Sequence, residues 1–141
     1  YGRLYNGHSI LDPRRLCPSG WAVPTDSIWM AMEVTLGMMQ EEAGQTGDRG
    51  EDEGKKLKSI TGWLDGNNGT NLSGFNGKPS GRRYDSGTYT FSGKWGYWWS
   101  SSMNQVETLW ARRLNYENDQ IGRYEGGYFL EEGLSVRCIK D

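Results

Sequence analysis

The chain has 141 residues and a formal net charge of −2, with 21 Gly, seven Trp, eight Tyr and two Cys. A charge so near neutral argues against a broad nucleic-acid-binding surface, which needs a basic field. No apolar run is long enough to span a bilayer, so we expect neither a nucleic-acid partner nor direct membrane insertion. The length fits one domain over 1–141, with a core built from a few large aromatic side chains.

The segment CPSGWAVPTDSIWMAMEVTLG, residues 17–37, predicts a short strand followed by a helix. Thr25 is a good N-cap for this helix, and Gly37 is a natural C-cap. The helical spacing i, i+3, i+7 predicts one apolar face packed on the core. That face carries Trp29, Met32 and Leu36.

Residues 40–56 are polar, acidic in the middle and interrupted by glycines, which predicts a loop or a frayed helix end. Residues 57–93 contain one Asx-Gly or Ser-Gly pair after another, so we expect turns and no long helix. The stretch DGNNGTN, residues 65–71, offers oxygen atoms that could bind calcium, but it lacks the EF-hand spacing. We expect no cofactor and no metal, with calcium as the alternative. The candidate oxygen ligands are Asp65, Asn67, Asn68 and Asn71.

The last third of the chain predicts antiparallel strands, at ETLWARRLN, IGRYEGGYF and LSVRCIKD. In the final strand Cys138 shares a face with the apolar residues Leu134 and Val136. Cys17 and Cys138 can form a disulfide across most of the chain, or they can be two buried free thiols. With early helices, a loop-rich middle and a late sheet, the predicted fold class is α+β.

The stretch GYWWSSS, residues 96–102, is read as core structure. On a strand Trp98 points to one side while Tyr97 and Trp99 point to the other. The serines that follow would need a base to act as nucleophiles, and His8 is the one histidine. No Gly-x-Ser-x-Gly, Walker or His-Glu-x-x-His motif occurs, so we do not expect an enzyme.

Several motifs occur in an order that resembles the Fibrobacter succinogenes major paralogous domain: YGRLYN, DPRRLCPSGWAVPTDSIW, GKKLKS, GTNLSGFNGKPSGRR, GYWWSSS and GLSVRCIKD. The similarity runs nearly end to end. Departures from the family pattern are local: Gly7-His8, Ile28 in place of an acidic residue, and FNGKPSGRR in place of a more usual FSALPGGYR.

The resemblance implies a C-type lectin-like fold related to the formylglycine-generating enzymes, with two helices, small antiparallel sheets and long loops. Its core would include Trp21, Trp29, Trp98 and Trp99. The terminal segments come together in this fold, which suits a Cys17–Cys138 bridge. The catalytic cysteines of the formylglycine-generating enzymes and the sugar-binding motifs of calcium-dependent lectins have no counterpart in this chain.

The last third also resembles the mutagenised segment in variable proteins of diversity-generating retroelements. Its mixture of Tyr, Trp and small polar residues resembles a paratope. The expected ligand face consists of Met103, Gln105, Glu107, Trp110, Arg112, Asn115, Tyr116, Asn118, Gln120, Arg123, Tyr124 and Tyr128, with Trp110 the most expected to be core instead.

The predicted function is a non-enzymatic ligand-binding domain of receptor or adhesin type, with a retroelement-diversified surface as the sharper version. Its partner would be a protein or glycan ligand on a cell surface. The resemblance places it outside the cell, on a bacterial surface or on a phage virion such as a tail fibre. The alternatives are a structural module of a surface lipoprotein or filament without a ligand, a formylglycine-generating-like enzyme, and a calcium-dependent lectin.

Overall fold

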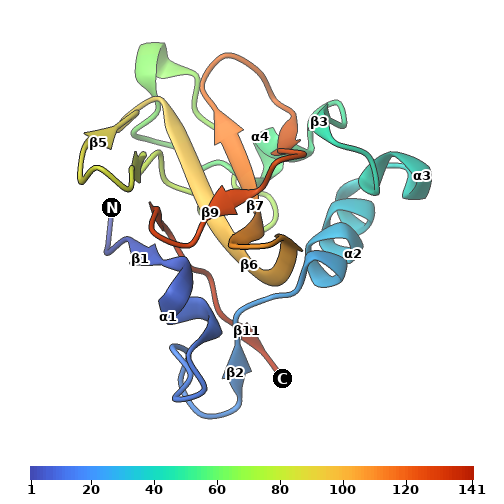
Figure 1. The fold of residues 1–141 in the computed structure, drawn as a ribbon. Helices are drawn as coiled ribbons and strands as arrows, with labels where there is room; N and C mark the ends of the chain where they lie inside the picture. Colours follow the sequence, from blue (N-terminus) through green and yellow to red (C-terminus); the bar gives the residue numbers. More distant parts are fainter.

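The computed structural model describes all residues from 1 to 141 and shows an α+β fold, as the sequence predicts (Figure 1). The resemblance implied two helices, and the structure has four, three of them no longer than five residues. A short 3-10 helix, η1, adds a single turn at Leu64–Gly66. The four helices are α1 (Gly7–Leu11), α2 (Asp26–Leu36), α3 (Gln40–Ala43) and α4 (Glu53–Leu57).

The strands form three antiparallel sheets, and the two long strands β6 and β7 run through the middle of the molecule (Figure 1). The main sheet has the order β3 (Gly47–Arg49), β8 (Ile121–Arg123), β7 (Thr108–Asn115) and β6 (Trp95–Gln105), with β9 (Tyr128–Phe129) also paired to β7. The second sheet has the order β1 (Tyr5–Asn6), β10 (Gly133–Leu134), β4 (Arg82–Arg83) and β5 (Tyr89–Thr90). The third pairs β2 (Trp21–Ala22) with β11 (Ile139–Lys140).

Helix α2 begins and ends where the sequence predicts. The Thr25 side chain accepts a hydrogen bond from the backbone N–H of Ile28 at 3.3 Å, and Gly37 ends the helix with φ = 127°. Its fully buried residues are Asp26, Trp29 and Glu33. Of the predicted apolar face, Trp29 is buried, whereas Met32 and Leu36 are only partly buried. The helix therefore turns two carboxylates into the protein interior.

The prediction of a loop or frayed helix end for residues 40–56 is wrong. This segment holds α3, β3 and most of α4. Its burial depends on partners far away in the sequence: Arg49 pairs with Glu33, and β3 pairs with β8. A polar, glycine-rich pattern does not reveal such partners, because it has no apolar periodicity.

The first half of strand β6 is buried on both sides, over Gly96–Ser100. Trp98 belongs to a core cluster with Trp29 of α2, whereas Tyr97 and Trp99 belong to a second cluster with Leu109 and Tyr128. The prediction that GYWWSSS forms core structure is confirmed, since alternating side chains fill two core layers.

Gly96, the second residue of β6, has no room for a side chain. A Cβ atom at this position would lie 2.7 Å from the carbonyl oxygen of Lys78, and it would also overlap the Trp98 ring. Any larger residue would therefore push apart the strand and the loop beside it.

A disulfide joins Cys17 to Cys138, with the two Cα atoms 5.9 Å apart. It lies beside the β2–β11 pair, so the start and the end of the chain are held together. Trp21 in β2 is 41% exposed, so its predicted place in the core is wrong. A two-stranded sheet has no second layer to cover that ring.

The predicted closing strand, residues 134–141, is divided in two. Leu134 ends β10, and β11 begins only at Ile139. Between them Ser135 exchanges backbone hydrogen bonds with β6: its N–H donates to Tyr97, and its carbonyl accepts from Trp99. The chain thus moves from one sheet to another within five residues, which the alternation of side chains does not predict.

Candidate ligand-binding surface

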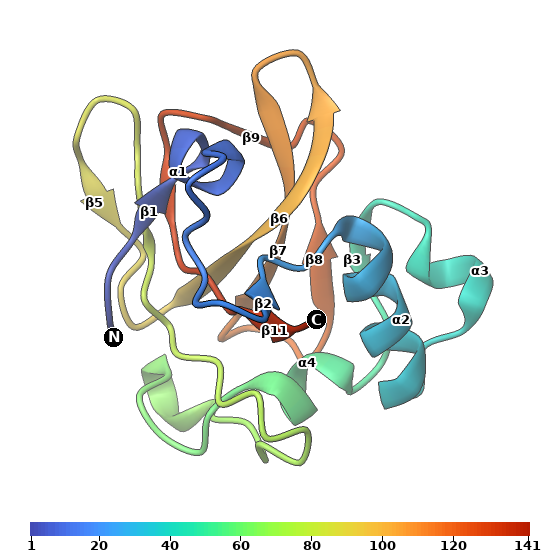
Figure 2. The same cartoon turned by 90° about the horizontal axis from the view of Figure 1, so that it is seen from below.

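Four large apolar side chains are exposed around the end of the β6–β7 hairpin. Val106 lies in the turn and is 88% exposed, while Met103 on β6 is 49% exposed. Phe129 on β9 and Tyr124 before it are 57% and 52% exposed. Figure 2 shows the β6–β7 turn projecting from the body of the molecule. We call these four residues the hairpin-end surface because they lie on neighbouring segments at this end of the sheet. Exposed large apolar groups are a common feature of interaction sites.

Backbone pairing and one side-chain hydrogen bond bring the three segments of this surface together. The antiparallel register places Phe129 opposite Thr108, at the start of β7. The Asn104 side-chain amide donates to the carbonyl oxygen of Glu125 at 2.7 Å, and so attaches the loop carrying Tyr124 to β6. The surface is therefore held by ordered backbone.

A cluster of buried charges lies between α2, β3, β7 and β8. Glu33 accepts two hydrogen bonds from Arg49, each 3.0 Å long, and another from Arg112. Asp26 accepts from Arg112 at 2.6 Å and from Arg123 at 2.8 Å. These five residues, which we call the buried ionic cluster, are each at most 8% exposed. Fork-shaped guanidinium groups paired with carboxylates fix both distance and direction, so the cluster orients the helix on the sheet.

The charges of the buried ionic cluster set the pKa of Asp26. Burial raises this pKa, but hydrogen bonds and charges from Arg123 and Arg112 outweigh burial and hold it below its usual value. A lowered carboxyl pKa stabilises the folded state above the unfolded-state pKa of about 3.9. The contribution of Asp26 is therefore present at neutral pH, and it is lost as the pH falls from the unfolded-state pKa through the lower, folded-state pKa.

Four of the twelve residues predicted for the ligand face lie in the interior, which corrects the prediction for them. Arg112 and Arg123 belong to the buried ionic cluster, and Tyr128 packs in the second core cluster. Asn115 is 3% exposed, and its side chain accepts backbone hydrogen bonds in the following turn. The physical reason is that the middle of this sheet is covered on both faces, so alternation does not bring its polar residues to the surface.

Trp110 occupies an intermediate position. It is partly buried, and the Arg123 guanidinium lies over its ring, 3.6 Å from the ring centroid. This cation–π contact uses one face of the indole. Trp110 therefore supports the buried ionic cluster from the solvent side.

The other seven predicted residues fall at two separate ends of the main sheet. Strand β7 spans eight residues, so its ends are about 23 Å apart at about 3.3 Å per residue. At the hairpin end lie Met103, Gln105, Glu107 and Tyr124. At the opposite end lie Tyr116, Asn118 and Gln120. The sequence therefore predicted one face where the structure has two.

The opposite end of the sheet is a polar loop anchored by a buried lysine. Lys58 is 1% exposed, and its ammonium group donates to the carbonyl oxygens of Asn115 and Asn118 and to the Asp119 carboxylate, at 2.8–3.2 Å. Burial lowers the pKa of Lys58, while the hydrogen bond and the charge of Asp119 act in the other direction. Lys58 thus fixes the loop that carries Tyr116 and Asn118.

The residues proposed for calcium lie near this loop, but some of their oxygen atoms are already bonded within the protein. The Asn68 side chain accepts a hydrogen bond from the Trp63 N–H, and Asn71 accepts one from the Asn76 N–H. No group of three or more His, Cys, Asp or Glu residues is placed to hold a metal ion.

Two serine hydroxyl groups of GYWWSSS form hydrogen bonds with the segment just before and at the start of α2. Ser101 donates to the carbonyl oxygen of Val23, and the Ser102 hydroxyl accepts from the backbone N–H of Asp26. The serines therefore connect β6 to the segment where α2 begins.

Two members of the hairpin-end surface, Val106 and Phe129, are not among the residues that the sequence predicts for a ligand face. A signal for Val106 was present, because it is the one apolar residue in the polar turn NQVET. Phe129 gave no such signal, since an aromatic residue in a strand is normally expected to pack against the core.

Together, these features define an α+β domain with a disulfide between its terminal segments, a charged interior and an exposed hairpin end. The chain belongs to the Fibrobacter succinogenes major domain family, whose sequence pattern matches residues 1–140. No curated protein and no solved structure matches it. The C-type lectin-like assignment therefore stays a prediction. None of the helices has the length and apolar character needed to cross a membrane.

Proposed function

We propose that this domain is a non-enzymatic ligand-binding module of receptor or adhesin type, and that it contacts a protein or glycan through the hairpin-end surface. The observation that carries the proposal is the exposure of Met103, Val106, Tyr124 and Phe129 on the ordered segments around the end of the β6–β7 hairpin. Rigid aromatic groups such as Tyr124 and Phe129 provide contact area at little cost in conformational entropy. The disulfide suits an oxidising compartment, which supports a place on a bacterial surface or a phage virion.

The test applies the purified domain to printed oligosaccharides and to purified bacterial surface proteins. We expect a saturable ligand whose affinity falls about tenfold or more in Tyr124→Ala or Val106→Glu, because a few anchors dominate an interface. Leu72→Ala is the matched control, since Leu72 is 76% exposed and lies outside this surface. Binding that survives both variants would contradict the site, and absence of any ligand would favour a structural module.

We further propose that natural variation in the last third of the chain falls on exposed positions. Core residues such as Leu109, Leu114 and Ile121 are at most 1% exposed, so they cannot change size without cost. Deep sequencing of this region in a natural population should show substitutions at adenines, concentrated at positions such as Met103 and Tyr124. Variation without base preference, or variation equally frequent in the core, would reject retroelement diversification.

A further inference from the structure

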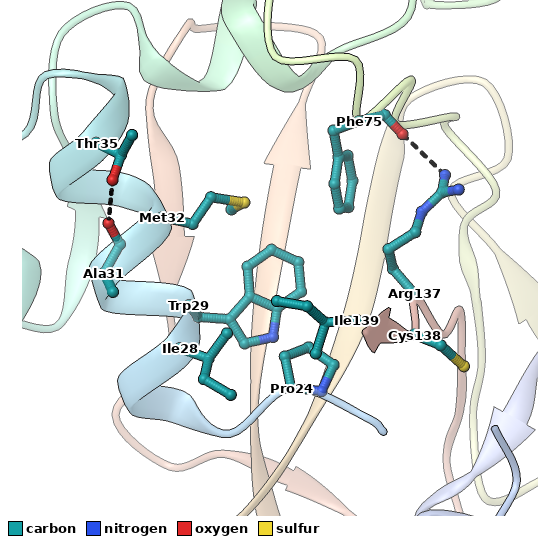
Figure 3. Close-up of a pocket in the computed structure, with 10 residues that line it drawn as sticks. All are labelled: Pro24, Ile28, Trp29, Ala31, Met32, Thr35, Phe75, Arg137, Cys138 and Ile139. Carbon is teal, nitrogen blue, oxygen red and sulfur yellow. Dashed lines mark hydrogen bonds between the residues drawn. The ribbon is translucent and has the colours of Figure 1, made fainter. Parts of the chain in front are cut away.

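An apolar groove, separate from the hairpin-end surface, lies between α2, the loop at Phe75 and the segment before β11. Figure 3 shows Met32 and Phe75 on its two sides, with the Trp29 ring between them. Its volume is about 380 Å³, which is in the range of small-molecule sites. Seven of its ten lining residues are hydrophobic. The full lining is Pro24, Ile28, Trp29, Ala31, Met32, Thr35, Phe75, Arg137, Cys138 and Ile139.

The polar groups along the walls of this groove are bonded within the protein. The Thr35 hydroxyl donates to the carbonyl oxygen of Ala31 at 2.9 Å, and the Trp29 ring N–H donates to that of Trp99 at 3.3 Å. The carbonyl oxygen of Phe75 accepts from Arg137 at 2.8 Å. A ligand lying along these walls would find few free hydrogen-bonding partners, so its body should be apolar.

The exception is Arg137, the one charged residue that lines the groove. One of its guanidinium nitrogens binds Phe75, and the group lies 5.0 Å from the Phe75 ring centroid. It forms no ion pair with any carboxylate of the chain. The guanidinium has five N–H donors, and its remaining donors stay available. No acidic side chain lines the groove to repel an anion.

The geometry points to a binding site for a small apolar monocarboxylate, with its hydrocarbon body against Trp29, Met32 and Phe75 and its carboxylate on Arg137. Apolar burial would supply most of the affinity, at about 25 cal/mol per Å² of surface removed from water. The ion pair with Arg137 would make the affinity for the carboxylate higher than that for a neutral or cationic compound of equal length. This site shares no residue with the hairpin-end surface, so it does not depend on the function proposed above.

The test is calorimetric titration of the whole domain with three eight-carbon probes: octanoate, octanol and octyltrimethylammonium. We expect octanoate to bind about fivefold more tightly than octanol, because an exposed ion pair contributes up to about 1 kcal/mol. The cationic probe should bind more weakly than octanol.

Three variants localise the site. Arg137→Gln should abolish the preference for octanoate while leaving octanol binding unchanged. Arg3→Gln removes an exposed arginine that does not line the groove, and it should keep the preference. Ala31→Trp should abolish binding of all three probes by filling the groove. Because Ala31 is exposed on α2, we expect this variant to fold. A melting curve is the control for its folding.

The proposal would be overturned by no binding of octanoate, by equal affinity for octanoate and octanol, or by octanoate binding that survives Ala31→Trp. A preference for octanoate that persists in Arg137→Gln would also contradict it, because the anion would then lie elsewhere.

Discussion

Replacing both Cys17 and Cys138 by Ala is expected to lower the free energy of unfolding by about 5 kcal/mol. The disulfide joins residues 121 positions apart, so it closes a loop of most of the chain. Without it the unfolded chain regains the conformational entropy of that loop. Since a domain is commonly stable by only 5–15 kcal/mol, roughly a third or more of its stability depends on this one bond.

Urea unfolding of the double variant, beside the oxidised wild type, measures this effect. Wild type under reducing conditions is the matched control, because it loses the bond and keeps both side chains. The two should agree within about 1 kcal/mol. A double variant as stable as the oxidised wild type would show that the β2–β11 pair alone holds the ends together.

Glu33→Gln is expected to destabilise the fold by about 3–5 kcal/mol, although it changes no side-chain volume. The carboxylate of Glu33 is the partner of both Arg49 and Arg112, and it is fully buried. The buried ionic cluster holds three guanidinium groups and two carboxylates. Removing one carboxylate leaves three buried positive charges with only Asp26 to balance them.

A double-mutant cycle of Glu33→Met and Arg49→Met, in which Glu33→Met removes the same carboxylate as Glu33→Gln, tests this explanation. Glu33→Met with Arg49→Met removes one charge of each sign and returns the cluster to its original net charge. The double variant should therefore be more stable than Glu33→Met alone, by about 2 kcal/mol or more. Glu41→Gln, on exposed surface, is the control and should change stability by less than about 0.5 kcal/mol. Additive losses in the cycle would contradict the charge-balance account.

Local signals in the sequence predicted the elements whose causes are local. Thr25 and Gly37 place the two ends of α2 by capping, and the alternation in GYWWSSS predicts a buried strand. The dense Gly and Asn pairs of residues 57–93 correctly exclude a long helix there. Each of these features depends on residues within a few positions of one another.

The candidate site was predicted less well than the helix and the strand. Whether a polar residue lies on the surface or in the interior depends on its tertiary contacts, which the sequence does not show. Arg112 and Arg123 have the polarity of ligand-contacting residues, yet their partners Asp26 and Glu33 lie on a helix more than 70 positions earlier. A charged residue is normally exposed unless it is paired, and no sequence pattern states the pairing. The same limit hid Arg49 within a segment that looks like a polar loop.

By itself, the sequence determined the fold class, the limits of the principal helix, the buried aromatic strand and the family to which the chain belongs. Capping, alternation and motif order are encoded by neighbouring residues, so they can be recognised in the sequence without knowledge of the fold. Only the tertiary structure decided which charges are buried, which apolar residues reach solvent at Val106 and Phe129, and where Arg137 meets the groove. Each of these depends on segments brought together from distant parts of the chain.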